Sequence, residues 1–349
     1  MLRIITSLLF VLLSHNSYAK YEYLLHKTYA ERYLAIDSIF YYNSNLRTDK
    51  EAFFREVNTL AKEARESGDT ELECEAGLLK VAYNSASKQG DFSKVEPEAF
   101  ALIWIAEKKK LVQIEMRCRQ FLGRFYMEKV GKYIQAMDQF LSSYHLLQQL
   151  PVEEFPTKKE HLYNVAHAYY NFGDFTSAKK YMMEAEMVKM PGNTTMLDDK
   201  NKIYTYINLE NTLGLIFRNE GKYDSAIYYF SIVHQLATKY KDSVWMGIAT
   251  GNIGICYYRQ GKYDEAILLL KEDIRQSFKA GQTDNGVNSL IKLTDIYLQK
   301  KELNTVKILM DSAARMLQPT LEPSQHLQHL CLIMARYYAA TGNTLMAYS

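Results

Sequence analysis

The sequence has little proline and little glycine, with 6 prolines and 16 glycines among 349 residues, where average usage is about 5% and 7%. So few breakers exclude a turn-rich β-sandwich and a disordered chain. An excess of charge of one sign is also absent, because 42 Lys and Arg face 40 Asp and Glu. We therefore predict no nucleic-acid partner. The densest basic run, Lys108-Lys109-Lys110, is interpreted as a solvated helix end.

Cysteine is scarce and its spacing is uninformative. The four cysteines, Cys74, Cys118, Cys256 and Cys331, form no Cys-x-x-Cys motif, which argues against a zinc or redox site. Each lies in a helical pattern, and we interpret all four as buried and unpaired. An oxidising compartment would leave three possible pairings open.

Long apolar runs are also scarce, and the one that stands out is at the N-terminus. Ile4 to Leu13 follows the basic Arg3 and precedes the small residues Ser17 and Ala19. This pattern predicts a secretory signal peptide at residues 1–19, cleaved before Lys20, with an uncleaved signal anchor as the alternative. Ten residues are too short to span a bilayer, which needs about 20. We expect an exported protein, periplasmic or on the periplasm-facing side of the inner membrane.

What the sequence does contain is a repeated glycine–x–aromatic tripeptide. Successive glycines lie 41, 42, 48 and 40 residues apart, and Gly342 follows 81 residues later, with Lys301 in the intervening slot. A period near 41 predicts stacked repeats. The tripeptides are Gly90-Asp91-Phe92, Gly131-Lys132-Tyr133, Gly173-Asp174-Phe175, Gly221-Lys222-Tyr223 and Gly261-Lys262-Tyr263.

Each repeat predicts an antiparallel helical hairpin. Glycine in the left-handed conformation ends the first helix, and Asp224 or Asp264 caps or electrostatically favours the start of the second. Small residues on both helices let the backbones approach while an aromatic residue fills the space beside them. The residues assigned these structural roles are Gly123, Gly131, Gly173, Gly214, Gly221, Ala226, Phe230, Gly254, Gly261 and Ala266.

These residues resemble the tetratricopeptide repeat, whose hallmark is Leu-Gly-x-x-Tyr, a glycine turn and then Ala-x-x-x-Phe. The segment from Leu213 to Phe230 matches closely, the one from Ile253 to Leu270 almost as well, and the repeat around Lys301 is degenerate. The resemblance implies an all-α fold, a right-handed α-solenoid of stacked antiparallel hairpins. The 41-residue period, against the family's usual 34, is similar to that of lengthened repeats in bacterial regulators.

The repeats predict a domain organisation. The expected parts are a signal peptide at 1–19, degenerate N-terminal helical hairpins at 20–110, TPR-like repeats at 111–190, a loop or hinge at 191–200 and TPR-like repeats at 201–349. The last repeat breaks off soon after Gly342. Because solenoid ends need capping, we expect the sequence to be a fragment of a longer protein.

The sequence contains no recognisable catalytic, phosphate-binding or metal-binding motif. The Gly-Lys pairs at 131, 221 and 261 are each followed by Tyr, which fits a turn and not a phosphate loop. His326 and His329 have helical spacing for a metal, but no third ligand lies at a suitable spacing. We therefore predict no catalytic residue, no cofactor and no metal in this sequence.

The outward face of each first helix predicts a concave groove for a protein or peptide partner. By their offset from each repeat's small residue, its lining residues are Asn164, His167, Tyr170, Asn208, Asn211, Arg218, Asn252, Tyr258, Arg259 and Lys292. Simple solvation of these side chains is the open alternative. The carboxylate clamp of co-chaperone modules is not expected. Among the positions that correspond to the clamp residues, only Asn252 is identical, and Lys292 conserves the charge alone.

An exported array of long tetratricopeptide repeats resembles the sensor region of bacterial membrane signalling proteins. That resemblance implies a membrane helix beyond Ser349, then a histidine kinase or a helix-turn-helix output domain. This part would then bind a partner or ligand without catalysis, touching a membrane only through the signal segment or that missing helix. The alternatives are a free periplasmic scaffold or assembly adaptor and, more remotely, an enzyme whose catalytic domain is missing.

Overall fold

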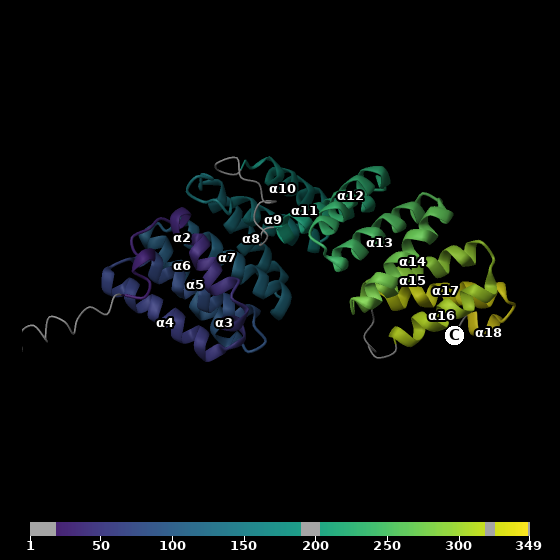
Figure 1. Ribbon diagram of the computed structural model, residues 1–349, viewed down its shortest axis with the longest axis horizontal. Coiled ribbons are helices and arrows are strands. Elements are labelled where there is room, and N and C mark those ends of the chain that lie inside the picture. Colours follow the sequence, from purple (N-terminus) through teal and green to yellow (C-terminus); the bar gives the residue numbers. More distant parts are fainter. Residues whose placement is uncertain (1–18, 190–202, 318–324, 348–349) are drawn as a thin grey trace, which may run out of the picture. The chain divides into compact units, whose positions relative to one another are not determined.

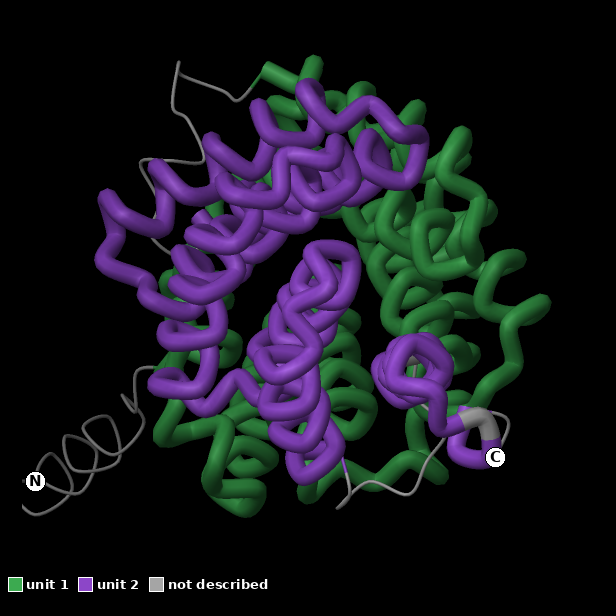
Figure 2. Tube along the Cα trace, turned by 90° about the vertical axis from the view of Figure 1, so that its right-hand side faces the viewer, with its two compact units in different colours: residues 1–201 green, residues 202–349 purple. Residues whose placement is uncertain are grey.

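A computed structural model describes residues 19–189, 203–317 and 325–347. Within these ranges the regular structure is entirely helical. The chain divides into two compact units, Met1–Asn201 and Lys202–Ser349, which Figure 2 colours separately. Residues 1–18 of the predicted signal peptide and the whole predicted hinge at 191–200 lie outside the described residues.

Unit 1 is a stack of antiparallel helices in which each helix packs on the next (Figure 1). Short π-helical turns at Asp37–Tyr41 and Tyr126–Val130 extend two of them. Two apolar clusters form its core, one around Val57 and Leu72 and the other around Val95 and Leu122. Its helices are α2 (Tyr29–Ile36), α3 (Ser44–Thr48), α4 (Lys50–Ser67), α5 (Thr70–Ala86), α6 (Phe92–Lys109), α7 (Val112–Phe125), α8 (Tyr133–Gln148), α9 (Lys158–Asn171) and α10 (Phe175–Met187).

Unit 2 contains the more regular repeats. First and second helices alternate along the chain, and each first helix from α13 onward also contacts the next first helix. This is the predicted solenoid of antiparallel hairpins. The helices are α11 (Ile203–Asn219), α12 (Tyr223–Lys239), α13 (Ser243–Arg259), α14 (Tyr263–Lys279), α15 (Thr283–Gln299), α16 (Leu303–Leu317), α17 (Gln325–Ala340) and α18 (Thr344–Ala347).

The turns inside the hairpins follow the predicted glycine positions. Gly131, Gly173, Gly221, Gly261 and Gly342 have φ between 73° and 78°, and Lys301 takes the same left-handed conformation in the slot that lacks glycine. The left-handed assignment of Gly90 is wrong, since Gly90 is not among the positive-φ residues. Its role is close packing instead, because a Cβ there would lie 2.3 Å from the carbonyl oxygen of Asn84.

The predicted close approach of paired helices is confirmed. A Cβ on Gly214 would lie 2.5 Å from Phe230, one on Gly123 would lie 3.0 Å from Phe140, and one on Gly254 would lie 3.2 Å from Leu270. Ala226 and Ala266, on the facing second helices, are fully buried. Small residues on the first helices therefore set the spacing within each hairpin.

Asp224 and Asp264 favour their helices through the dipole and do not cap them. Helix α12 begins at Tyr223, so Asp224 lies in its first turn and no side chain caps that end. An acidic residue there still interacts favourably with the helix N-terminus. The Asp224 carboxylate also accepts a hydrogen bond of 2.8 Å from Gln260, and Asp264 pairs with Lys300 at 2.9 Å.

The cysteine prediction holds for three residues and fails for one. Cys74, Cys118 and Cys256 are buried and unpaired, and burial raises the pKa of Cys118 to about 12. Cys331, which lies on α17, is also unpaired but is exposed. The basic run at 108–110 is exposed at the end of α6, as predicted. In the described part of the chain no helix is long and apolar enough to cross a membrane.

Candidate functional site

The first helices of unit 2 place polar side chains at regular spacing on one face. Helix α15 lies between α13 and α17 and contacts both. Its residues Asn288, Ile291, Lys292 and Asp295 lie at i, i+3, i+4 and i+7, which is one side of a helix. Residues of α13 and α17 meet this side and enclose two adjoining cavities with it.

The cavities have volumes of about 250 and 520 Å³ and share Arg259, Lys292 and His329 in their walls. We call the pair the basic cavity. Four of its side chains carry a positive charge and only Asp295 carries a negative one, although the whole sequence has a net charge of only +2. Its lining residues are Arg218, Asn219, Tyr223, Ile255, Tyr258, Arg259, Asn288, Ile291, Lys292, Asp295, His326, His329, Leu332, Ile333 and Arg336.

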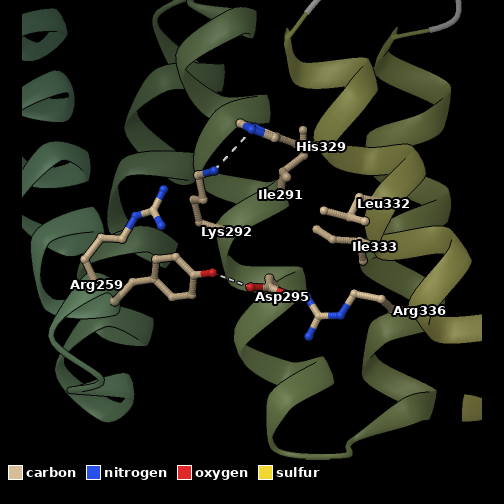
Figure 3. Close-up of a pocket in the computed structure, with 9 residues that line it drawn as sticks. Arg259, Ile291, Lys292, Asp295, His329, Leu332, Ile333 and Arg336 are labelled. Atoms are coloured by element: carbon tan, nitrogen blue, oxygen red, sulfur yellow. Dashed lines mark hydrogen bonds and ion pairs between the residues drawn. The ribbon is translucent and has the colours of Figure 1, made fainter. Parts of the chain in front are cut away.

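The single carboxylate of the basic cavity is held by two neighbours. The Tyr258 hydroxyl donates a short hydrogen bond to Asp295, and the Arg336 guanidinium donates one of 2.6 Å to its other oxygen (Figure 3). Burial and this hydrogen bond raise the pKa of Tyr258 well above its ordinary value, so its hydroxyl stays protonated. Asp295 therefore joins α13, α15 and α17, and among the described residues its side-chain hydrogen bonds come from Tyr258 and Arg336 and not from Lys292 or Arg259.

Those other cations lie close to one another. The Lys292 Nζ is 3.5 Å from the His329 Nδ1, and Figure 3 shows the two side chains reaching toward each other. Burial, followed by the charge of Arg259, lowers the pKa of Lys292. The charge of Lys292 and then burial lower the pKa of His329, and His326 and Arg259 add to the effect. The site is thus a region of positive potential.

A second polar ladder runs along α11 and α13. The Asn252 amide donates to Asn211 Oδ1 at 3.1 Å, and Arg218 donates to Asn252 Oδ1 at 2.7 Å. Asn208 instead donates to the carbonyl of Tyr204 on its own helix. Of the predicted groove residues, Arg218, Tyr258, Arg259 and Lys292 therefore line the cavities, while Asn208, Asn211 and Asn252 do not.

The three groove residues predicted in unit 1 form their own polar contacts. Asn164 donates to Gln120 Oε1 at 3.2 Å, beside His161, whose pKa burial lowers well below its ordinary value. His167 contacts Asn171 at 3.2 Å and stacks near Tyr170 with ring centroids 6.3 Å apart. These residues are half-buried within unit 1.

Sequence reasoning missed the contribution of α17 and of Asp295. Ala335 and Tyr338 are the α17 counterparts of Gly254 and Tyr257, both two periods on, but they lack the Leu-Gly signature that set the register elsewhere. Had α17 been aligned with α15 in this way, Arg336, which lies 41 residues after Asp295, would have been predicted on the same face of its helix as Asp295.

His326 and His329 are better explained as cavity residues than as metal ligands. Among the described residues no group of three or more His, Cys, Asp or Glu side chains is arranged to hold a metal ion. The His326 Nδ1 is buried and has no hydrogen-bond partner within the described structure. Both histidines border the larger cavity.

Comparison with known proteins agrees with the repeat assignment. The tetratricopeptide repeat family matches residues 205–272. These residues are therefore similar to tetratricopeptide repeats. No curated protein sequence matches the chain significantly.

Solved structures of similar fold cover most of the chain. The apo form of RapI superimposes with a TM-score of 0.60 at 13% identity, over 84% of this chain and 93% of that one. A Rap protein complexed with Competence and Sporulation Factor gives 0.54 at 15%, covering 91% and 85%. NprR in complex with its cognate peptide NprX gives 0.52 at 16%, covering 88% and 85%. At such identities the likeness establishes the TPR-like solenoid fold alone.

Proposed function

We propose that unit 2 binds a peptide segment of a partner in its basic cavity. The observation that carries the proposal is the convergence of α13, α15 and α17 on two adjoining cavities lined by cations, amides and apolar side chains. Clefts that combine apolar walls with a few convergent polar groups are the usual form of a ligand site. The solenoid's repeated first helices extend such a surface along a peptide.

Two structural neighbours support a peptide as the ligand class. One is a Rap protein complexed with Competence and Sporulation Factor, and the other is NprR in complex with its cognate peptide. Both are tetratricopeptide-like solenoids of similar extent. The arrangement requires no catalytic step, since binding alone would serve a sensor or adaptor.

Selection of displayed random 12-residue peptides on the full chain tests this proposal. Leu332 lines the cavity and is 59% exposed, while Leu268 on α14 is 71% exposed and does not line it. We expect Leu332→Trp to fill the entrance and abolish binding of the selected peptides. The matched control Leu268→Trp should bind them as the unchanged chain does. Selection of no peptide, or equal binding by both variants, would refute the proposal.

We further propose that the chain is the exported sensing part of a membrane signalling protein, processed before Lys20. The Lys20 backbone nitrogen lies 2.8 Å from Glu63 Oε1, and the Tyr21 nitrogen lies 2.7 Å from Glu63 Oε2. Processing there would replace a neutral N–H by an α-ammonium group directly at the Glu63 carboxylate. A partly exposed pair of this kind contributes up to about 1 kcal/mol.

Export and processing are tested together. A fusion of the chain to alkaline phosphatase should be active in the periplasm, and mass spectrometry should find Lys20 as the first residue. Glu63→Gln should then lower the urea midpoint of the processed chain more than that of a chain carrying a neutral N-terminal tag. An inactive fusion would contradict export, and an intact N-terminus would contradict processing.

A further inference from the structure

The basic cavity contains positive charge that the described part of the chain does not neutralise. No ion pair among the described residues involves Arg259, which lies 5.8 Å over the ring of Tyr258, or Lys292, whose polar neighbour is a histidine nitrogen. Asp295 is already engaged by Tyr258 and Arg336. An anion entering the cavity would therefore meet at least two cations with no competing carboxylate of their own.

Placing the charged side chains of Arg259 and Lys292 close together is electrostatically unfavourable without such an anion. Each like charge within a few ångströms disfavours the protonation of its neighbours. Burial and then the charge of Arg259 lower the pKa of Lys292, and the charge of Lys292 and then burial lower the pKa of His329. The buried, unpartnered Nδ1 of His326 borders the same space. A ligand anion would relieve the repulsion between the cations and supply acceptors for their N–H groups.

An apolar wall adjoins the cations. Ile291 and Ile333 are buried, at 1% and 4% exposure, while Leu332 is 59% exposed at the edge of the smaller cavity. Figure 3 shows Leu332 and Ile333 pointing from α17 toward α15. Exposed Leu332, next to the buried Ile291 and Ile333, provides an apolar surface that one side chain of a ligand can contact.

We infer that the basic cavity recognises a peptide carboxylate next to an apolar side chain, with Arg259 and Lys292 binding the carboxylate and Ile291, Leu332 and Ile333 contacting the side chain. This inference rests on the proposed function and specifies its ligand class. The carboxylate has two possible sources, the C-terminus of a peptide ending in an aliphatic residue or an Asp or Glu side chain beside one. Arg336 pairs with Asp295 at 2.6 Å, so that carboxylate already has a cationic partner.

Fluorescence anisotropy of four labelled peptides with the full chain tests the inference. The probes are Ser-Gly-Ser-Gly-Leu as the free acid, the same peptide as its C-terminal amide, the amide with Glu before Leu, and the amide with Lys before Leu, each labelled at its N-terminus with an uncharged BODIPY dye. We expect at least one of the two carboxylate-bearing peptides to bind about ten-fold or more tighter than the neutral amide and the lysine peptide. Tight binding of the free acid alone identifies the C-terminus, and tight binding of the Glu amide identifies the side chain.

Variants locate the binding to the proposed cations. Arg259→Ala and Lys292→Met should each weaken the acidic probe about ten-fold, and Arg259→Lys should retain part of the affinity because it keeps the charge. Lys239→Met, which removes an exposed cation on α12 outside the cavity, should change nothing. Raising the salt concentration from 50 to 500 mM should weaken the acidic probe and leave the neutral one unaffected.

Three results would overturn the inference. These are equal binding of acidic and neutral probes, unchanged binding in Arg259→Ala and Lys292→Met, and no binding of either acidic probe at 1 mM protein. The outcome remains separable from the proposed function. If peptides selected by display bind in a manner blocked by Leu332→Trp but carry no carboxylate, the peptide site stands and its anionic specificity falls.

Discussion

The substitution Gly214→Ala tests the packing rule that builds the hairpins. A Cβ at position 214 would lie 2.5, 2.7 and 2.9 Å from three ring atoms of Phe230, where ordinary contacts are about 3.5–4.0 Å. Phe230 is fully buried in the cluster with Ala226 and Cys256, so the ring has little room to move. Overpacking of this kind costs about 1–3 kcal/mol.

The expected net cost is smaller, because alanine is the better helix former by about 1 kcal/mol. We therefore expect Gly214→Ala to destabilise unit 2 by about 1 kcal/mol, within a range of about 0–2 kcal/mol. Gly254→Ala is the matched control, since its Cβ would lie 3.2 Å from Leu269 Cβ and from two side-chain atoms of Leu270, which is looser than the contact of 2.5 Å at Gly214. There the propensity gain should equal or exceed the strain, and the variant should be neutral or slightly stabilised.

A second substitution should restore the stability lost in Gly214→Ala. Because Gly254 faces leucine where Gly214 faces phenylalanine, Phe230→Leu should make room for the added methyl group. In a double-mutant cycle the cost of Gly214→Ala should vanish in the Phe230→Leu background, giving a coupling of about 1 kcal/mol or more. Urea unfolding followed by circular dichroism, with hydrogen exchange of α11 and α12 to assign the transition to unit 2, measures each corner. A Gly214→Ala variant more stable than the unchanged chain, or the same stability change in both backgrounds, would refute the packing argument.

Three further predictions concern charge. Burial raises the pKa of Asp273, so the charged carboxylate destabilises the fold at pH 7, and this destabilisation disappears as the pH falls through the raised pKa. Asp273→Asn should therefore unfold at a higher urea concentration than the unchanged chain at pH 7 and lose that advantage at pH 4. Lys292 lowers the pKa of His329, and a bound carboxylate would raise it. The affinity for the acidic probe, measured by anisotropy titration, should therefore increase as the pH falls from 8 to 5.5. His329→Gln should reduce this pH dependence. In unit 1, Arg117→Met would leave the buried Glu75, now 2.6 Å from Arg117, without its partner and should cost about 3–5 kcal/mol in urea unfolding, most of it recovered by adding Glu75→Gln.

The hairpins were predictable because their determinants are local. A left-handed turn needs glycine or a tolerant residue at one position, and this requirement repeats with the period at Gly173, Gly221 and Gly261. Gly90 shows the limit of the argument, since a glycine required for close packing is indistinguishable in sequence from one required for its φ angle. Burial of the small residues followed from the same pattern.

The site was predictable only in part. The offset rule found Tyr258, Arg259 and Lys292, but it treated each repeat by itself. It therefore could not show that Asn211 and Asn252 bond to each other, which removes them from the list of open groove groups. Contacts between equivalent positions of successive repeats depend on how the hairpins stack, which the spacing within one repeat does not specify.

The position of α17 after α13 and α15 has a consequence for chains that are cut short. Helices α13 and α15 can stack without α17 because solenoid repeats contact mainly their neighbours. Yet His329, Leu332 and Arg336 arrive only with α17. A nascent or shortened chain that ends after α16 would keep a folded solenoid and have half a pocket. If the proposed cavity binds its ligand as inferred, such a shortened chain would lack these three side chains and would not compete with the full chain for the ligand.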